Sequence, residues 1–380
     1  MILPPLSLYV HIPWCVRKCP YCDFNSHEAA QIPEDMYVDA LVADLQQDLP
    51  MVQGRRLQSV FFGGGTPSLF SGSSIARILD AADKNIGFAE QAEITLETNP
   101  GTAEYHNLAG YKAAGVNRIS FGIQSFKNEH LQALGRIHNS GEAVLAIEKA
   151  RKAGFTNINL DLMHGLPGQS VQDAVSDLTR AIEQQPEHIS WYQLTIEPNT
   201  VFYSRPPALP EDEILADIQD AGQELLAQAG FRQYEVSAYA HPGRQSLHNL
   251  NYWQFGDYLG IGAGAHGKIS YPEEQIIRYR KTRKPADYLH AEKPFTAGSE
   301  PVPLEQQPLE FMMNALRLVD GVPRSFFAER TQLSDSALAP HLPALIAKGL
   351  LTGDPARLQP TALGLRFLND ILAAFAEAEE

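Results

Sequence analysis

The apolar residues in the first half of the chain alternate between two spacings. Short runs rich in β-branched and aromatic residues are typical of buried strands, and each is followed by a segment whose apolar residues recur every three or four positions, as in an amphipathic helix. Six strands are predicted in this way, at residues 6–13, 59–62, 93–100, 118–124, 157–164 and 188–197. The helices expected to follow them lie at residues 33–49, 75–82, 108–111, 130–134, 140–152 and 171–182.

The repeated strand–helix units predict a parallel sheet whose strands are joined by helical crossovers. An open, doubly wound sheet is one alternative and a β/α barrel is the other. Glycines and polar residues with distinctive chemistry occur repeatedly at the carboxyl ends of the predicted strands, where a β/α barrel collects its functional groups. The pattern therefore favours an α/β fold with a partial (β/α)6 barrel, which we expect to span residues 1–200.

The regular alternation ends after Glu197, and residues 201–300 are expected to extend the barrel. The elements predicted there are a proline-rich connection at 198–210, a helix at 211–229, a strand at 234–239, an aromatic and glycine-rich stretch at 248–267, and a solvated loop with the basic run Arg278, Arg280, Lys281, Arg283 and Lys284. Residues 301–380 are predicted to form a mostly helical, winged-helix-like domain. Its elements are a linker at 301–308, helices at 309–319, 325–330 and 334–350, a hairpin at 351–360 and a last helix from residue 361.

Composition and charge limit the classes of partner. The chain has 380 residues, 44% of them hydrophobic and 20% charged, enough to bury a sizeable core, and no apolar run approaches the roughly 20 residues that span a bilayer. The first residues, MILPPLSLYVHIP, lack the basic region of a secretory signal, so we expect a cytoplasmic protein. The net charge of −15 argues against nucleic acid as a partner. The tail has ten acidic and six basic residues after residue 300, so packing or dimerisation is expected of it rather than DNA binding.

All three cysteines of the chain lie in one loop after the first predicted strand. Cys15, Cys19 and Cys22 follow the spacing C-x3-C-x2-C, and three such thiolates suit zinc or an iron–sulfur cluster. A structural zinc site needs a fourth protein ligand, for which His11 and His27 are nearest. A cubane cluster held by three cysteines leaves one iron open to a substrate. The spacing alone also leaves open three unligated thiols.

A glycine-rich loop, residues 63–67 (GGGTP), follows the second predicted strand. Such a loop can offer carbonyls to an ammonium group and N–H groups to a carboxylate, and the alternative is an ordinary tight turn. Four more polar residues stand at or just beyond the third, fourth and fifth strands. Together they supply a cation for a carboxylate, a carboxylate for an ammonium, and partners for hydroxyl groups; they are Glu97, Gln124, Arg136 and Asp161.

With these residues in place, the chain resembles a known family. The cysteine spacing is similar to the cluster motif of the radical S-adenosylmethionine (SAM) superfamily, in which SAM fills the fourth iron. The segments YVHIPWCVRKCPYCDF, FFGGGTPS, ETNP, SFGIQSF, LGRIH and DLMHGLPGQ look like those of its oxygen-independent coproporphyrinogen oxidase family. The likeness runs from about residue 6 through the C-terminal helices.

This resemblance implies a 4Fe–4S cluster on Cys15, Cys19 and Cys22, with SAM bound beside it. It places Arg136 at the SAM carboxylate, and Gln124 and Asp161 at the ribose. The full set of residues that it implies as SAM contacts is Tyr9, Gly64, Gly65, Thr66, Glu97, Gln124, Arg136 and Asp161.

Two departures separate this chain from the oxidases that it resembles. The oxidases carry a further cysteine two residues after the last cluster ligand, where this chain has Phe24, and a long N-terminal extension that is missing from this sequence. Both departures match a branch of the family whose members are regarded as haem chaperones. That branch is also marked by the segment H-N-x-x-Y-W, found here at residues 248–253.

A histidine followed by an aromatic pair can ligate haem iron and stack on the macrocycle, although a core histidine in an aromatic cluster is the alternative. The resemblance favours a role of His248, Tyr252 and Trp253 in haem binding. It does not assign the axial ligand of the iron. The basic run could meet haem propionates or an anionic membrane surface, but we expect a solvated loop.

Three functions are weighed. The preferred one is a haem chaperone on a radical SAM scaffold that delivers haem to acceptors such as respiratory cytochromes. The alternatives are SAM-dependent decarboxylation of coproporphyrinogen III and regulation through the tail, which its acidity disfavours. A flavodoxin- or ferredoxin-type reductant would be a further partner, and catalysis, membrane contact and homodimerisation are left open.

Overall fold

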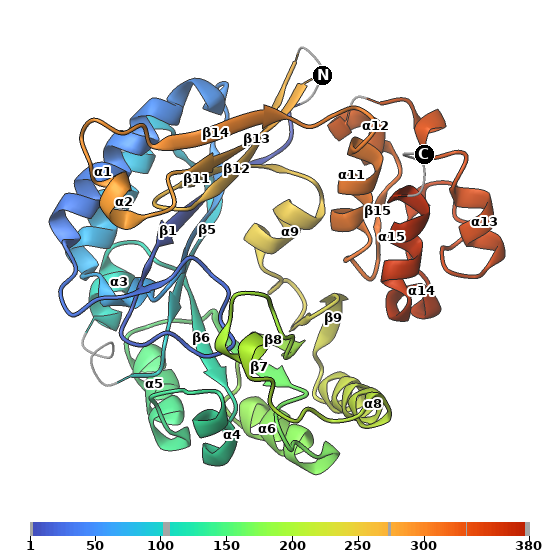
Figure 1. Cartoon of the computed structure of the whole chain (residues 1–380), viewed down its shortest axis with the longest axis horizontal. Helices are drawn as coiled ribbons and strands as arrows, with labels where there is room; N and C mark the ends of the chain where they lie inside the picture. Colours follow the sequence, from blue (N-terminus) through green and yellow to red (C-terminus); the bar gives the residue numbers. More distant parts are fainter. Residues whose placement is uncertain (1–2, 102–106, 273–274, 332, 377–380) are drawn as a thin grey trace.

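Six parallel strands that neighbour one another in chain order form the centre of the protein (Figure 1). The computed structural model describes residues 3–101, 107–272, 275–331 and 333–376. The six strands are β1 (Leu6–Ile12), β4 (Leu57–Gly64), β5 (Phe88–Thr98), β6 (Arg118–Gln124), β7 (Ile158–His164) and β8 (His188–Gln193). A doubly wound sheet reverses its strand order at a switch point, whereas a β/α barrel does not. The observed order confirms the predicted barrel of six β/α units.

Helices between these strands cover the outer side of the curved sheet (Figure 1). Two begin at capping boxes, one formed by Asn139 with Glu142 and the other by Ser170 with Asp173. The elements of this layer and of the loops are α1 (Glu34–Asp48), η1 (Leu49–Val52), η2 (Pro67–Leu69), α2 (Gly72–Asn85), α3 (Leu108–Ala113), α4 (Asn128–Ala133), α5 (Ser140–Lys152), α6 (Val171–Glu183), and the short pair β2 (Trp14–Cys15) and β3 (His27–Glu28). Among the described residues, no helix combines the length and apolarity that crossing a lipid bilayer requires.

Further strands extend the sheet at both edges, so the barrel is partial. One edge adds β11 (Asp257–Ile261), parallel to β1, followed by β12 (His266–Tyr271), β13 (Gln275–Lys281) and β14 (Thr296–Pro301), all antiparallel. The other edge adds β10 (Ala238–Ala240) and β9 (Arg232–Glu235). The helices of this region are α7 (Val201–Ser204), α8 (Asp212–Gln228), α9 (Leu247–Trp253) and α10 (Pro285–Tyr288).

Two sequence expectations in this region are wrong. The single strand expected at 234–239 is a hairpin, because residues 236–237 turn the chain between β9 and β10. The basic run does not lie wholly in a loop, since its first part belongs to β13. Charged residues fit this strand because Arg278 pairs with Glu310 and Lys281 has carboxylate partners in the core.

The C-terminal segment is mostly helical and packs against the barrel extension (Figure 1). Its elements are α11 (Gln307–Ala315), β15 (Val322–Pro323), α12 (Ser325–Thr331), η3 (Asp335–Ala337), α13 (Leu342–Ala347), β16 (Arg357–Leu358), α14 (Ala362–Arg366) and α15 (Leu368–Ala376). The helix expected at 334–350 is broken into η3 and α13, because Pro340 and Pro343 cannot sit inside a continuous helix. The core contains Phe311 and Phe327 together with Tyr234 and Phe255 of the extension. The domain boundaries at residues 200 and 300 stay a prediction.

A buried ion cluster fastens the extension to the barrel. The ammonium Nζ of Lys281, on β13, lies 2.6 Å from Asp44 Oδ1 and 2.8 Å from Asp48 Oδ2, both on α1. The Lys281 and Asp44 side chains are fully buried, and Tyr288 donates a further hydrogen bond to Asp44 at 2.6 Å. Buried charges are tolerated only when paired, so this cluster ties the two elements together.

We expect Lys281→Met to lower the free energy of unfolding by about 3–5 kcal/mol, because it leaves two carboxylates buried without a cation. Equilibrium urea denaturation followed by circular dichroism measures the change. Lys284→Met, which removes an exposed lysine three residues further on, is the matched control and should change stability by less than about 0.5 kcal/mol. Equal stability of the two variants would contradict this account.

Candidate functional site

The cysteine loop lies at the carboxyl ends of the barrel strands. Cys15, Cys19 and Cys22 are free thiols of intermediate exposure, and all three line a cavity of about 340 Å³, which we call the cysteine cavity. Burial raises the pKa of the Cys15 and Cys22 thiols. Binding of iron would displace their protons, since a metal-ligating cysteine is a thiolate.

Backbone contacts with the glycine-rich loop hold the start of the cysteine loop in place. The N–H of Gly65 donates to Ile12 O at 2.8 Å and the N–H of Thr66 donates to Trp14 O at 2.7 Å. A Cβ atom at Gly65 would lie 2.4 Å from Trp14 O, so only glycine allows this approach. Gly64 has a φ of +111°, and a Cβ atom there would lie 2.5 Å from the His11 ring.

Three N–H groups of the glycine-rich loop have partners within the protein. The N–H groups of Gly65 and Thr66 bind the neighbouring backbone, and the N–H of Gly64 donates to the Glu97 carboxylate. These N–H groups are therefore engaged within the protein. The loop instead positions other groups: the Thr66 hydroxyl accepts a hydrogen bond from Asn99 Nδ2 at 3.0 Å.

Arg136 joins the cysteine loop to the ends of the barrel strands. One guanidinium nitrogen, Nη2, donates to Asn99 Oδ1 at 2.5 Å and to Gly122 O at 2.7 Å, while Nη1 lies 3.5 Å from Cys19 Sγ. Its Nε is buried and has no hydrogen-bond partner among the described residues. An unpaired buried donor in a cavity is costly unless a ligand satisfies it, which fits an anionic group beside Arg136.

The other polar residues predicted at the strand ends, Glu97, Gln124 and Asp161, also line the cysteine cavity. Asp161 accepts hydrogen bonds from Ser120 Oγ and Asn159 Nδ2, each at 2.8 Å. Burial and, to a smaller extent, the nearby Asp161 carboxylate together raise the pKa of Glu97 to about 8. A cationic ligand beside these carboxyl groups would restore their charge, so the cavity suits an ammonium group.

The donor set of the cysteine cavity fits a cubane cluster and a small zwitterion. Within the described residues, no three His, Cys, Asp or Glu side chains surround one point as ligands of a single metal ion. In a cubane, by contrast, each thiolate binds a different iron atom. The carboxyl groups and the guanidinium of Arg136 supply the complementary charges.

Sequence reasoning missed several residues of this cavity, among them Asn99, Tyr21, Ser190 and Tyr192. Tyr192 donates to Gln124 Oε1 at 2.8 Å and thereby orients that amide. The alternation of side chains along a strand could have predicted two of these lining residues, since Ser190 and Tyr192 are two residues apart on β8 and face the same side.

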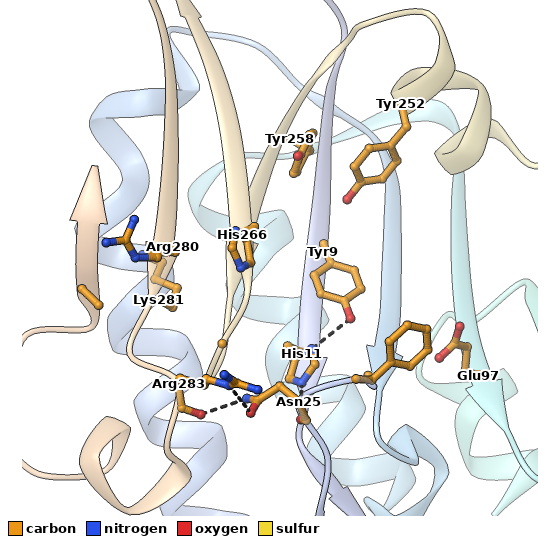
Figure 2. Close-up of a pocket in the computed structure, with 14 residues that line it drawn as sticks. Tyr9, His11, Asn25, Glu97, Tyr252, Tyr258, His266, Arg280, Lys281 and Arg283 are labelled. Atoms are coloured by element: carbon orange, nitrogen blue, oxygen red, sulfur yellow. Dashed lines mark hydrogen bonds between the residues drawn. The ribbon is translucent and has the colours of Figure 1, made fainter. Parts of the chain in front are cut away.

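A second, larger cavity of about 850 Å³ adjoins the first, and we call it the extension cavity (Figure 2). Phe24, Gly64 and Glu97 line both cavities. Tyr9, predicted as a SAM contact, lies in the extension cavity, where its hydroxyl donates to His11 Nδ1 at 3.0 Å. The remaining lining residues include Asn25, Tyr252, Tyr258, Gly264, His266, Arg280, Lys281, Arg283 and Ala297.

The three residues predicted for haem have different surroundings. His248 is buried, its Nδ1 is hydrogen-bonded to Ser59 Oγ at 3.0 Å, and its ring stacks on Phe61 with centroids 4.8 Å apart. Tyr252 lines the extension cavity. Trp253 packs in the C-terminal core, with the Arg317 guanidinium 4.3 Å from its ring centroid. A direct part of all three in haem binding stays a prediction.

Comparisons with known proteins identify the family. Residues 9–181 match the Radical SAM superfamily and residues 302–367 match the HemN C-terminal domain. Heme chaperone HemW of Haemophilus influenzae is 52% identical over 382 residues, covering 99% of both chains. Heme chaperone HemW of Escherichia coli is 51% identical and covers 98% of both chains, and that of Bacillus subtilis is 35% identical over 97% of this chain and 98% of that protein.

A solved structure shows the same fold. Coproporphyrinogen III oxidase (HemN) of Escherichia coli, a radical SAM enzyme, superposes with a TM-score of 0.82, covering 98% of this chain and 90% of that one. Its sequence identity is 24%, so this likeness speaks for the fold and not for the activity. The identity to the HemW proteins, over nearly the whole of both chains, places this chain in the HemW family of the radical SAM superfamily.

Proposed function

We propose that this protein is a haem chaperone, which binds haem and delivers it to haem-requiring proteins. The observation that carries the proposal is the 52% identity, over 99% of both chains, to a protein named Heme chaperone HemW. The extension cavity supports it, because about 850 Å³ is within the range of cofactor sites and its lining is rich in aromatic side chains. Respiratory cytochromes are the class of acceptor that we propose.

The cysteine cavity would hold the cofactors of the radical SAM scaffold. A 4Fe–4S cluster on Cys15, Cys19 and Cys22, when bound, supplies electrons to the sulfonium of SAM. The position of Arg136 beside Cys19 supports its assignment to the SAM carboxylate, and the partly buried Glu97 suits the ammonium group. Gln124 and Asp161, on neighbouring strands, are proposed to bind the ribose hydroxyls.

Further partners belong to the same proposal. A cluster of this kind needs an electron donor, and a flavodoxin- or ferredoxin-type protein supplies electrons one at a time. The described helices include none that could cross a membrane, and we propose that the protein acts in the cytoplasm.

The first prediction concerns the cluster. Anaerobic reconstitution of the wild-type protein with iron and sulfide should give a reduced cubane EPR signal that changes on addition of SAM. Cys19→Ser should abolish cluster assembly, because two thiolates cannot hold the cube in place of three. Val16→Ala, at an exposed position of the same loop, is the control and should assemble the cluster normally. A stable protein that contains zinc and no iron would contradict the prediction.

The second prediction concerns SAM binding. Arg136→Ala should weaken SAM binding about tenfold or more without loss of the cluster, since a charge-assisted hydrogen bond contributes roughly 1.5–3 kcal/mol. Equilibrium dialysis on the reconstituted protein, with iron analysis alongside, measures both quantities. Arg205→Ala, which removes an exposed arginine outside both cavities, serves as the control. Unchanged affinity of Arg136→Ala would show that Arg136 does not bind the carboxylate.

The third prediction is that the protein does not convert coproporphyrinogen III to protoporphyrinogen IX. Radical chemistry on a propionate needs one C–H bond held close to the reacting group, and small displacements cost orders of magnitude in rate. Here the phenyl ring of Phe24, 61% exposed, lines both cavities where the resembling oxidases carry a cysteine. Product analysis with SAM and a reductant is the test, with HemN as positive control, and multiple turnovers would restore the oxidase alternative.

A further inference from the structure

The extension cavity has an aromatic side and a basic side. Tyr9, Tyr252 and Tyr258 lie on one side, and His266, Arg280 and Arg283 come from β12, β13 and the loop that follows (Figure 2). Aromatic faces suit a flat apolar ligand, while guanidinium groups suit carboxylates. The two sides together suit a planar, aromatic ligand with carboxylates at its edge.

Two of the three cations that line the cavity are available to a ligand. The ammonium of Lys281 is neutralised in the core by Asp44 and Asp48. Arg280 is paired at 3.3 Å with Glu300, but their side chains are 54% and 71% exposed, and such surface pairs contribute little.

The third cation, the Arg283 side chain, is exposed, and its one hydrogen bond to another described residue is a long one, 3.4 Å to Asn25 Oδ1. Arg280 and Arg283 are three residues apart in the chain, and both line the cavity. The two guanidinium groups can therefore meet two carboxylates of one ligand.

His266 is a free imidazole in this cavity. It is exposed, and its ring nitrogens have no hydrogen-bond partner within the described residues. The ring nitrogens of His11 are both occupied, one by the Tyr9 hydroxyl and the other by Asn25 O. His248, in contrast, is buried against Ser59 and does not line the cavity.

The strand register brings His266 and Arg280 together. They are directly opposite on the antiparallel pair β12 and β13, so their side chains point to the same face of the sheet. Partial desolvation in the cavity, together with Arg280 and Arg278, lowers the pKa of His266, and the neutral imidazole is the form that binds a metal. An imidazole that can bind iron, His266, and a guanidinium that can bind a carboxylate, Arg280, therefore lie next to each other on one wall of the extension cavity.

We propose that the extension cavity is the haem site, with His266 as the axial ligand of the iron, Tyr252 and Tyr258 against the porphyrin, and Arg280 and Arg283 at the propionates. This inference rests on the proposed haem-binding function and adds its location and ligands. It assigns His248 a structural role in the core in place of iron ligation.

The first experiment compares histidine variants by haem titration, with resonance Raman and EPR spectra of the complexes. Wild-type protein should bind about one haem per chain with a histidine-ligated iron. His266→Ala should lose that signature, and added imidazole should restore it in His266→Gly. His290→Ala, at an exposed histidine outside the cavity, is the control and should keep the wild-type spectrum.

The outcomes distinguish failure of the proposed haem-binding function from failure of the assigned iron ligand. If wild-type protein binds no haem, the proposed function fails. If wild-type protein binds haem and His266→Ala retains the histidine signature, the function stands and the assigned ligand is overturned. Loss of the signature in His248→Ala alone, in protein with normal circular dichroism, would move the ligand to that residue.

The second experiment tests the propionate contacts by changing the ligand as well as the protein. Wild-type protein should bind haem about tenfold or more tightly than haem dimethyl ester, measured in the same detergent, because the ester has no carboxylate charge. The double variant Arg280→Ala/Arg283→Ala should lose this preference, and Arg244→Ala, an exposed arginine outside the cavity, should keep it. An undiminished preference in the double variant would overturn the assignment of the two arginines.

Discussion

The site depends on the close approach of two backbone segments at the top of the barrel. Gly65 lies against the Trp14 carbonyl, where any side chain would collide, and two backbone hydrogen bonds hold the segments together. This contact places Cys15 beside the carboxyl ends of the strands. The contact thereby fixes the start of the cysteine loop relative to Glu97 and Arg136.

The open side of the barrel creates the second cavity. The added strands β11 to β14 continue the sheet from β1 and form a wall opposite the barrel residues (Figure 1). Buried ion pairs fasten this wall, with Lys281 bound to Asp44 on α1 and Lys268 bound to Asp257 at 2.8 Å. Lys281 also lines the cavity, but its charge is satisfied in the core by Asp44 and Asp48, which leaves Arg280 and Arg283 as the lining cations for a ligand.

Helix α9 links the barrel to the C-terminal domain. Its first turn carries His248, which is hydrogen-bonded to Ser59 on β4, and its last residue, Trp253, contacts Arg317 beyond α11. Tyr252 lies between them and reaches the extension cavity. One helix therefore connects the barrel, the cavity and the C-terminal core. Residues of this short motif that do not touch a ligand still hold the helix between the two parts of the protein.

Local periodicity in the sequence determined the elements of the barrel, and the strand at 118–124 and the helix at 140–152 have the predicted bounds. The resemblance to a known family likewise predicted that Cys15, Cys19 and Arg136 lie at one site, and all three line the cysteine cavity. Only the tertiary structure decided that the basic run enters β13 and that His266, rather than His248, faces a cavity. The direction in which His266 faces depends on strand register, and the place of the basic run in β13 depends on carboxylates from a distant helix. Neither kind of contact leaves a periodic pattern in the sequence.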